Sequence, residues 1–81
     1  MLWKQMKPYE RRTPPPISLL INTANSYSCN IFIINKERKI NVKDYDELIR
    51  NLKFRENKLL FIFDGADEED AQQHIERLFT Q

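Results

Sequence analysis

The sequence predicts an α+β fold: a four-stranded, mainly antiparallel sheet with three helices on one face. Three runs rich in β-branched and aromatic residues are typical of strands, and the opening "LWKQMK" is ambiguous but fits a fourth. Three other stretches carry apolar residues at helical spacing. The resulting order is β-α-β-β-α-β-α, which suits a sheet covered by helices. With 81 residues, of which 41% are hydrophobic, we expect a single domain spanning residues 1–81.

The chain opens with "LWKQMK", which fits a first strand, and continues into the proline-rich "YERRTPPPISLLI". We expect a helix from about Pro14 to Ser26, since proline is tolerated in a first helical turn and Thr13 offers an N-cap oxygen. A polyproline linker is the alternative, but it would leave the following apolar stripe without a purpose. The stripe recurs at i, i+3, i+4 and i+7 and consists of Ile17, Leu20, Ile21 and Ala24.

The middle of the chain predicts a hairpin. Its arms are 30–34, "NIFII", and 39–43, "KINVK", joined by the polar "NKER". In the second arm Ile40 and Val42 alternate with polar residues, which gives one buried face and one wet face.

A short helix is expected in "DYDELIRNL". Asp44 is a good N-cap, and Glu47 follows three residues later, as in a capping box. Leu48 and Leu52 share one face of this helix.

The last strand and helix give the strongest patterns. "KLLFIFDG" (58–65) is apolar throughout its centre and ends at the only glycine in the chain. Acidic residues at 67–70 then place negative charge where the dipole of a helix favours it. The apolar stripe of this final helix consists of Ala71, Ile75, Leu78 and Phe79.

Composition argues against several classes of function. Thirteen basic residues against twelve acidic ones leave a net charge of +1, and no aromatic-plus-basic motif suggests nucleic acid. Cys29 is the only cysteine, no metal-ligand spacing occurs, and no glycine-rich loop indicates a cofactor. No apolar run approaches the roughly twenty residues of a membrane span. We therefore expect a cytoplasmic protein that is not an enzyme and has no metal, cofactor or membrane partner.

The order of elements, "VKDYDEL" and "DGADEEDAQQHIERLF" resemble the histidine-containing phosphocarrier protein of the bacterial sugar phosphotransferase system, HPr. The resemblance covers nearly the whole chain and implies an open-faced β-sandwich. In that family a phospho-accepting histidine precedes the first helix. Here its position falls at Thr13, or at Arg12 if the register slips by one residue. A guanidinium is no nucleophile, and a threonine phosphoester is a poor donor for onward transfer. His74 belongs to the last helix and is expected to be an ordinary helical residue.

The resemblance also matches Asp44 to a serine that is phosphorylated for regulation in some members. A fixed carboxylate would imitate the phosphate in part, besides capping the helix. We therefore expect a regulatory or adaptor protein whose partners are phosphotransferase-system components or a transcriptional regulator. A phosphotransfer protein that uses Thr13 or Ser18 is one alternative, and a structural dimerisation module is another. The partner-binding surface implied by the resemblance consists of Arg11, Arg12, Pro15, Ser18, Asn22, Tyr45 and Ile49.

The strands are apolar on both faces, although this fold covers only one of them. Alternation directs Leu59, Phe61 and Phe63 toward the helices. The residues between them then face outward, and exposed apolar patches of this kind mark interaction sites. We expect an association surface, for a homodimer or another protein, with Trp3 beside it. Its central residues are Phe32, Ile34, Leu60 and Ile62.

Overall fold

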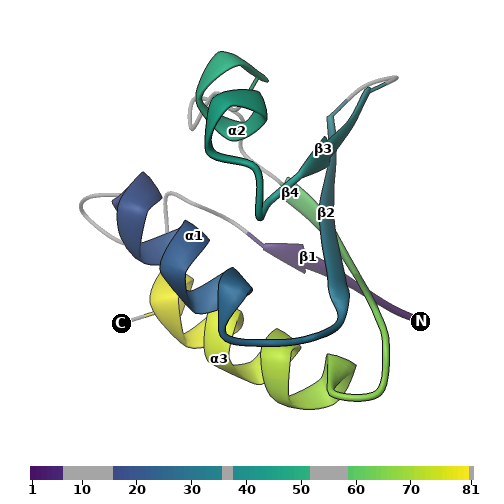
Figure 1. The fold of residues 1–81 in the computed structure, drawn as a ribbon. Helices are drawn as coiled ribbons and strands as arrows, with labels where there is room; N and C mark the ends of the chain where they lie inside the picture. Colours follow the sequence, from purple (N-terminus) through teal and green to yellow (C-terminus); the bar gives the residue numbers. More distant parts are fainter. Residues whose placement is uncertain (7–15, 36–37, 52–58, 81) are drawn as a thin grey trace.

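The computed structural model describes residues 1–6, 16–35, 38–51 and 59–80. Its elements follow the expected order, and their bounds are β1 (Leu2–Met6), α1 (Ile17–Asn25), β2 (Asn30–Asn35), β3 (Arg38–Asn41), α2 (Tyr45–Asn51), β4 (Leu59–Asp64) and α3 (Glu68–Thr80). The four strands form one sheet in the order β1-β4-β2-β3. Each of the three pairings is antiparallel, so the sheet has no parallel part among the described strands. Figure 1 shows α1 and α3 side by side next to the sheet, with α2 above α1 and on the same side of β3.

The core lies between the sheet and the helices. Alternate strand residues point toward the helices. Five of them are completely buried: Ile31, Ile33, Leu59, Phe61 and Phe63. Phe61 contacts Phe79 of α3 edge to face, with ring centroids 5.6 Å apart. The inward and outward directions predicted for β2 and β4 are therefore confirmed. The apolar stripes of α1 and α3 are confirmed as well, and of their residues only Ile17 is partly exposed.

α1 begins later than expected. Its first residue is Ile17, and Pro16 occupies the N-cap position without a side-chain hydrogen bond. The predicted cap, Thr13, and the predicted start, Pro14, lie outside the described residues. At the N-cap position the missing N–H of Pro16 costs nothing, because the first N–H groups of a helix have no acceptor within the helix. The backbone N–H of Leu20 donates to the carbonyl of Pro16 at 3.1 Å, which closes the first turn.

α2 confirms Asp44 as an N-cap but not the full capping box. The Asp44 carboxylate accepts the backbone N–H of Glu47 at 3.1 Å. The Glu47 carboxylate does not return this contact to Asp44, since it accepts the backbone N–H of Asn41 at 3.2 Å. It therefore ties α2 to the end of β3. Leu48 is buried as predicted, and Leu52 lies outside the described residues.

The start of α3 is attached to the start of β2. The Asp67 carboxylate accepts the backbone N–H groups of Ser28, at 2.8 Å, and Cys29, at 2.9 Å. The Ser28 hydroxyl donates to the same carboxylate at 3.2 Å. Asp67 was expected to stabilise the dipole of its own helix. In the structure it instead satisfies backbone donors that precede a neighbouring strand.

Candidate docking surface on α1 and α2

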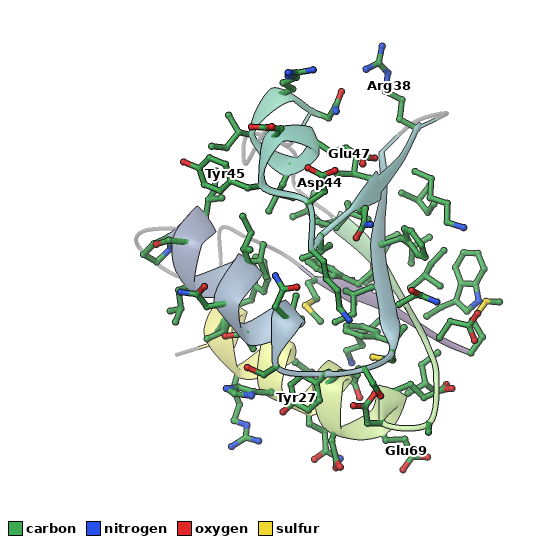
Figure 2. All side chains as sticks on the ribbon, in the orientation of Figure 1. Tyr27, Arg38, Asp44, Tyr45, Glu47 and Glu69 are labelled. Atoms are coloured by element: carbon green, nitrogen blue, oxygen red, sulfur yellow. The ribbon has the colours of Figure 1, made fainter. Side chains whose placement is uncertain are left out.

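Three large apolar side chains are exposed on α1 and α2, two helices that contact each other. Leu19 of α1 is 43% exposed, and Tyr45 and Ile49 of α2 are 55% and 44% exposed. Tyr45 and Ile49 are four residues apart, so they lie on one side of α2. Figure 2 shows Tyr45 on the side of α2 that faces the N-terminal end of α1. We call Leu19, Tyr45 and Ile49 the α1–α2 patch.

Polar side chains surround the α1–α2 patch. Ser18 and Asn22 are exposed on α1, as the sequence predicted, and they share a face at a spacing of four residues. Asp44, Asp46 and Arg50 are exposed on or beside α2. An apolar centre with a polar and charged rim is the usual composition of a protein-binding surface.

Four of the residues expected to bind a partner, Ser18, Asn22, Tyr45 and Ile49, are exposed on the contacting helices α1 and α2. The other three, Arg11, Arg12 and Pro15, lie outside the described residues. The expectation did not include Leu19. It interrupts the polar side of α1, and an apolar residue away from the buried stripe was the signal that could have revealed it.

His74 lies elsewhere in the fold. Its ring belongs to α3 and is half-buried, and its Nδ1 is 2.9 Å from the hydroxyl oxygen of Tyr27. The two rings meet edge to face, with centroids 5.9 Å apart. Tyr27 follows the C-terminal end of α1, at the opposite end from Tyr45 (Figure 2). His74 is therefore a half-buried residue of the last helix, as predicted.

Cys29 is also unsuited to chemistry. Its side chain is 2% exposed, and burial raises the pKa of its thiol to about 11, with the nearby Asp67 carboxylate acting in the same direction. Such a thiol holds little thiolate at neutral pH, and thiolate is the nucleophilic form. Among the side chains that the structure describes, no three of His, Cys, Asp and Glu form a group that could hold a metal ion.

Comparison with known proteins places this geometry in context. No family model and no curated protein matches the chain. Solved structures do match, among them three that span more than nine tenths of it. HPr-C-His from Thermoanaerobacter tengcongensis has a TM-score of 0.83 at 21% identity, and the match covers 98% of this chain and 91% of that one. The Mycoplasma histidine-containing phosphocarrier protein has 0.78 at 23%, covering 95% and 90%. HPr from Bacillus anthracis has 0.78 at 18%, covering 96% and 95%.

This chain has an HPr-like fold.

The match also extends to Crh from Bacillus subtilis, with a TM-score of 0.71 at 22% identity over 79% of this chain and 74% of Crh. That structure is described as a dimer with a swapped domain. The agreement with all four proteins concerns the path of the backbone, including the open antiparallel sheet. In the HPr-like chain no described helix is long and apolar enough to cross a membrane.

Proposed function

We propose that this HPr-like chain is a regulatory or adaptor module related to the sugar phosphotransferase system. It binds a protein partner through the α1–α2 patch and is not loaded with phosphate on a histidine. One observation carries the proposal: Leu19, Tyr45 and Ile49 are exposed on the contacting helices α1 and α2 of a fold that phosphocarrier proteins share. Aromatic and aliphatic side chains inside a polar rim are the residues that most often dominate binding energy.

The position of His74 supports the second half of the proposal. It is the only histidine in the chain, and it contacts Tyr27 beyond the C-terminal end of α1. A phosphoryl group on Nδ1 of His74 would disrupt that hydrogen bond, and on either ring nitrogen it would lie away from the α1–α2 patch. The chain would thus bind a partner without offering it a phosphohistidine, and it would act in the cytoplasm, where the system's soluble components meet.

The candidate partners are a phosphotransferase-system protein and a transcriptional regulator. Asp44 favours a transcriptional regulator as the partner, because its carboxylate lies exposed at the start of α2 beside Tyr45. A carboxylate there supplies part of the charge of a phosphoserine at all times. A regulator that reads a negative charge at this helix terminus would bind the chain without prior phosphorylation.

The first experiment separates an adaptor from a carrier. The chain is incubated with phosphoenolpyruvate and the first enzyme of the phosphotransferase system, with HPr as a positive control, and intact mass is measured. We expect no added phosphate on this chain. Phosphate on Thr13, or on the exposed Ser18 in the first turn of α1, would instead make it a phosphotransfer protein.

The second experiment tests the surface. Amide NMR spectra of the chain are recorded while the same enzyme, or the regulator, is added. We expect shifts concentrated around Leu19, Tyr45 and Ile49, and at least tenfold weaker binding for Ile49→Lys. Gln73→Lys, an equal change of charge at an exposed position of α3, is the matched control and should bind normally. Lack of binding by both proteins would leave the dimerisation module as the better interpretation.

A further inference from the structure

The outer face of the sheet, on the side away from the helices, carries a second apolar surface. The pairing register places its residues in two rows that cross the strands. One row contains Trp3, Ile62, Phe32 and Asn41. The next contains Gln5, Leu60, Ile34 and Lys39. Both rows point away from the helices because their neighbours along each strand point toward them. We call the five apolar residues Trp3, Phe32, Ile34, Leu60 and Ile62 the outer-face cluster.

These side chains cover one another only in part. Ile62 is 7% exposed because Trp3 and Phe32 flank it in the same row, and it does not belong to the core on the helix side. Trp3 at the edge remains 59% exposed, and Phe32, Ile34 and Leu60 are intermediate. Strands that are apolar on both faces normally have both faces covered.

The charges around the outer-face cluster are arranged symmetrically about Phe32. Lys39 lies on β3, the neighbour of β2 on one side, where it pairs with Ile34. Asp64 lies on β4, the neighbour of β2 on the other side, where it pairs with Asn30. Both are exposed, and the Lys39 ammonium is 4.0 Å from the centroid of the Phe32 ring. The nearby N-terminal ammonium of Met1 pairs with Glu68 at 2.9 Å.

We propose that a second copy of this chain docks on this face, about a two-fold axis in the plane of the interface. The axis passes near Phe32, perpendicular to the line that joins Lys39 and Asp64. Such an axis exchanges the positions of Lys39 and Asp64, so each Lys39 meets Asp64 of the second copy. The contact is isologous and forms two equivalent ion pairs on either side of a Phe32–Phe32 centre. The self-complementary charges therefore favour another copy as the occupant.

The size of the face sets the strength of this contact. Strands about 4.8 Å apart and five residues long present roughly 300 Å² of sheet plane, and two such faces with their side chains bury on the order of 1,000 Å². That area is at the lower end of specific interfaces. The dimer is therefore weak, with a dissociation constant of the order of micromolar to hundreds of micromolar, and it forms only in concentrated solution.

Charge reversal tests the arrangement directly. Sedimentation velocity is measured on the wild type, K39E and D64K from about 10 µM to about 1 mM, concentrations chosen to bracket this affinity. We expect the wild type to dimerise and each variant to dimerise at least tenfold more weakly, because each places like charges opposite each other twice. An equimolar mixture of the two variants should dimerise again, since both pairs of the mixed dimer then join a carboxylate to an ammonium. Thermal melting confirms that both variants remain folded.

Several results would overturn the inference. A wild type that stays monomeric at the highest concentration would remove the dimer, and variants that dimerise like the wild type would place the contact elsewhere. Failure of the mixture to restore it would exclude the Lys39–Asp64 pairing. Leu19→Lys is the control: it changes the α1–α2 patch and should leave dimerisation unchanged. If it abolished the dimer, the contact would belong to the docking patch. The phosphoenolpyruvate experiment is unaffected by any of these results, so the inference and the proposed function fail separately.

Discussion

Gly65 is the residue where β4 turns toward α3. Its φ of +157° is one that residues with a Cβ rarely adopt. A Cβ added there would lie 2.6 Å from both the Cα and the Cβ of Cys29. The Cα of Cys29 is backbone, which cannot move without displacing the start of β2. The sequence identified Gly65 as the end of a strand, but this close approach to Cys29 depends on the sheet pairing.

The first prediction follows from this contact. Gly65→Ala should destabilise the protein by about 3 kcal/mol, because it combines overpacking with backbone strain. Urea unfolding monitored by circular dichroism measures the change. Ala66→Ser, at the exposed neighbouring position, should stay within about 0.5 kcal/mol of the wild type. Equal stability of Gly65→Ala would mean that β4 and β2 separate easily at this end.

At the scale of the element, the sequence predicted the faces of helices and strands better than their ends. The stripe of α1 follows from spacing, so its buried side could be predicted from the sequence. The start of α1 could not be predicted, because each of the three consecutive prolines at 14–16 is acceptable just before or inside a first turn. The second role of Glu47 was equally unpredictable, since its contact with Asn41 needs β3 in place.

The second prediction concerns the cap of α2. Asp44→Ala removes the acceptor of the Glu47 N–H and should cost about 1 kcal/mol of stability. Asp44→Ser keeps a capping oxygen and should lie close to the wild type. Chemical denaturation of the three proteins provides the comparison. If the serine variant is as unstable as the alanine variant, the contribution of Asp44 comes from its charge and not from its hydrogen bond.

At the scale of the whole molecule, the contacts between distant segments could not be predicted from the sequence. Tyr27 meets His74, and Asp67 meets Ser28, across many intervening residues. The sequence placed each of these residues in its element but offered no reason to pair them. The candidate site shows the same division: Tyr45 and Ile49 were expected, whereas Leu19 was identified only from its exposure on α1, which contacts α2.

The third prediction is an acid-dependent loss of stability. Hydrogen bonds, chiefly from the Ser28 backbone, lower the pKa of Asp67, and the N-terminal ammonium lowers the pKa of Glu68. A carboxylate whose pKa is lower in the folded state stabilises the fold at pH values above its pKa in the unfolded chain, which is about 4. That stabilisation is lost as the pH falls through the folded value. The melting temperature should therefore fall as the pH drops below about 5, where these carboxylates begin to bind protons.

Asp67→Asn identifies the group responsible. This variant should have a lower melting temperature than the wild type at neutral pH. Its melting temperature should fall less on acidification, because the asparagine side chain does not titrate. Glu69→Gln removes an exposed carboxylate from the first turn of the same helix and is the matched control. An unchanged acid profile in Asp67→Asn would assign the effect to other carboxylates.

The strand order has a consequence for the way this chain is made. β1 has a single neighbour in the sheet, and that neighbour is β4, so Leu2 pairs with Phe63. During translation, the first strand therefore emerges from the ribosome long before its partner has been synthesised. Its tryptophan and methionine are then open to chaperones and to the corresponding segments of other nascent chains. Of the four strands, β1 emerges before its partner and is among the last to be placed.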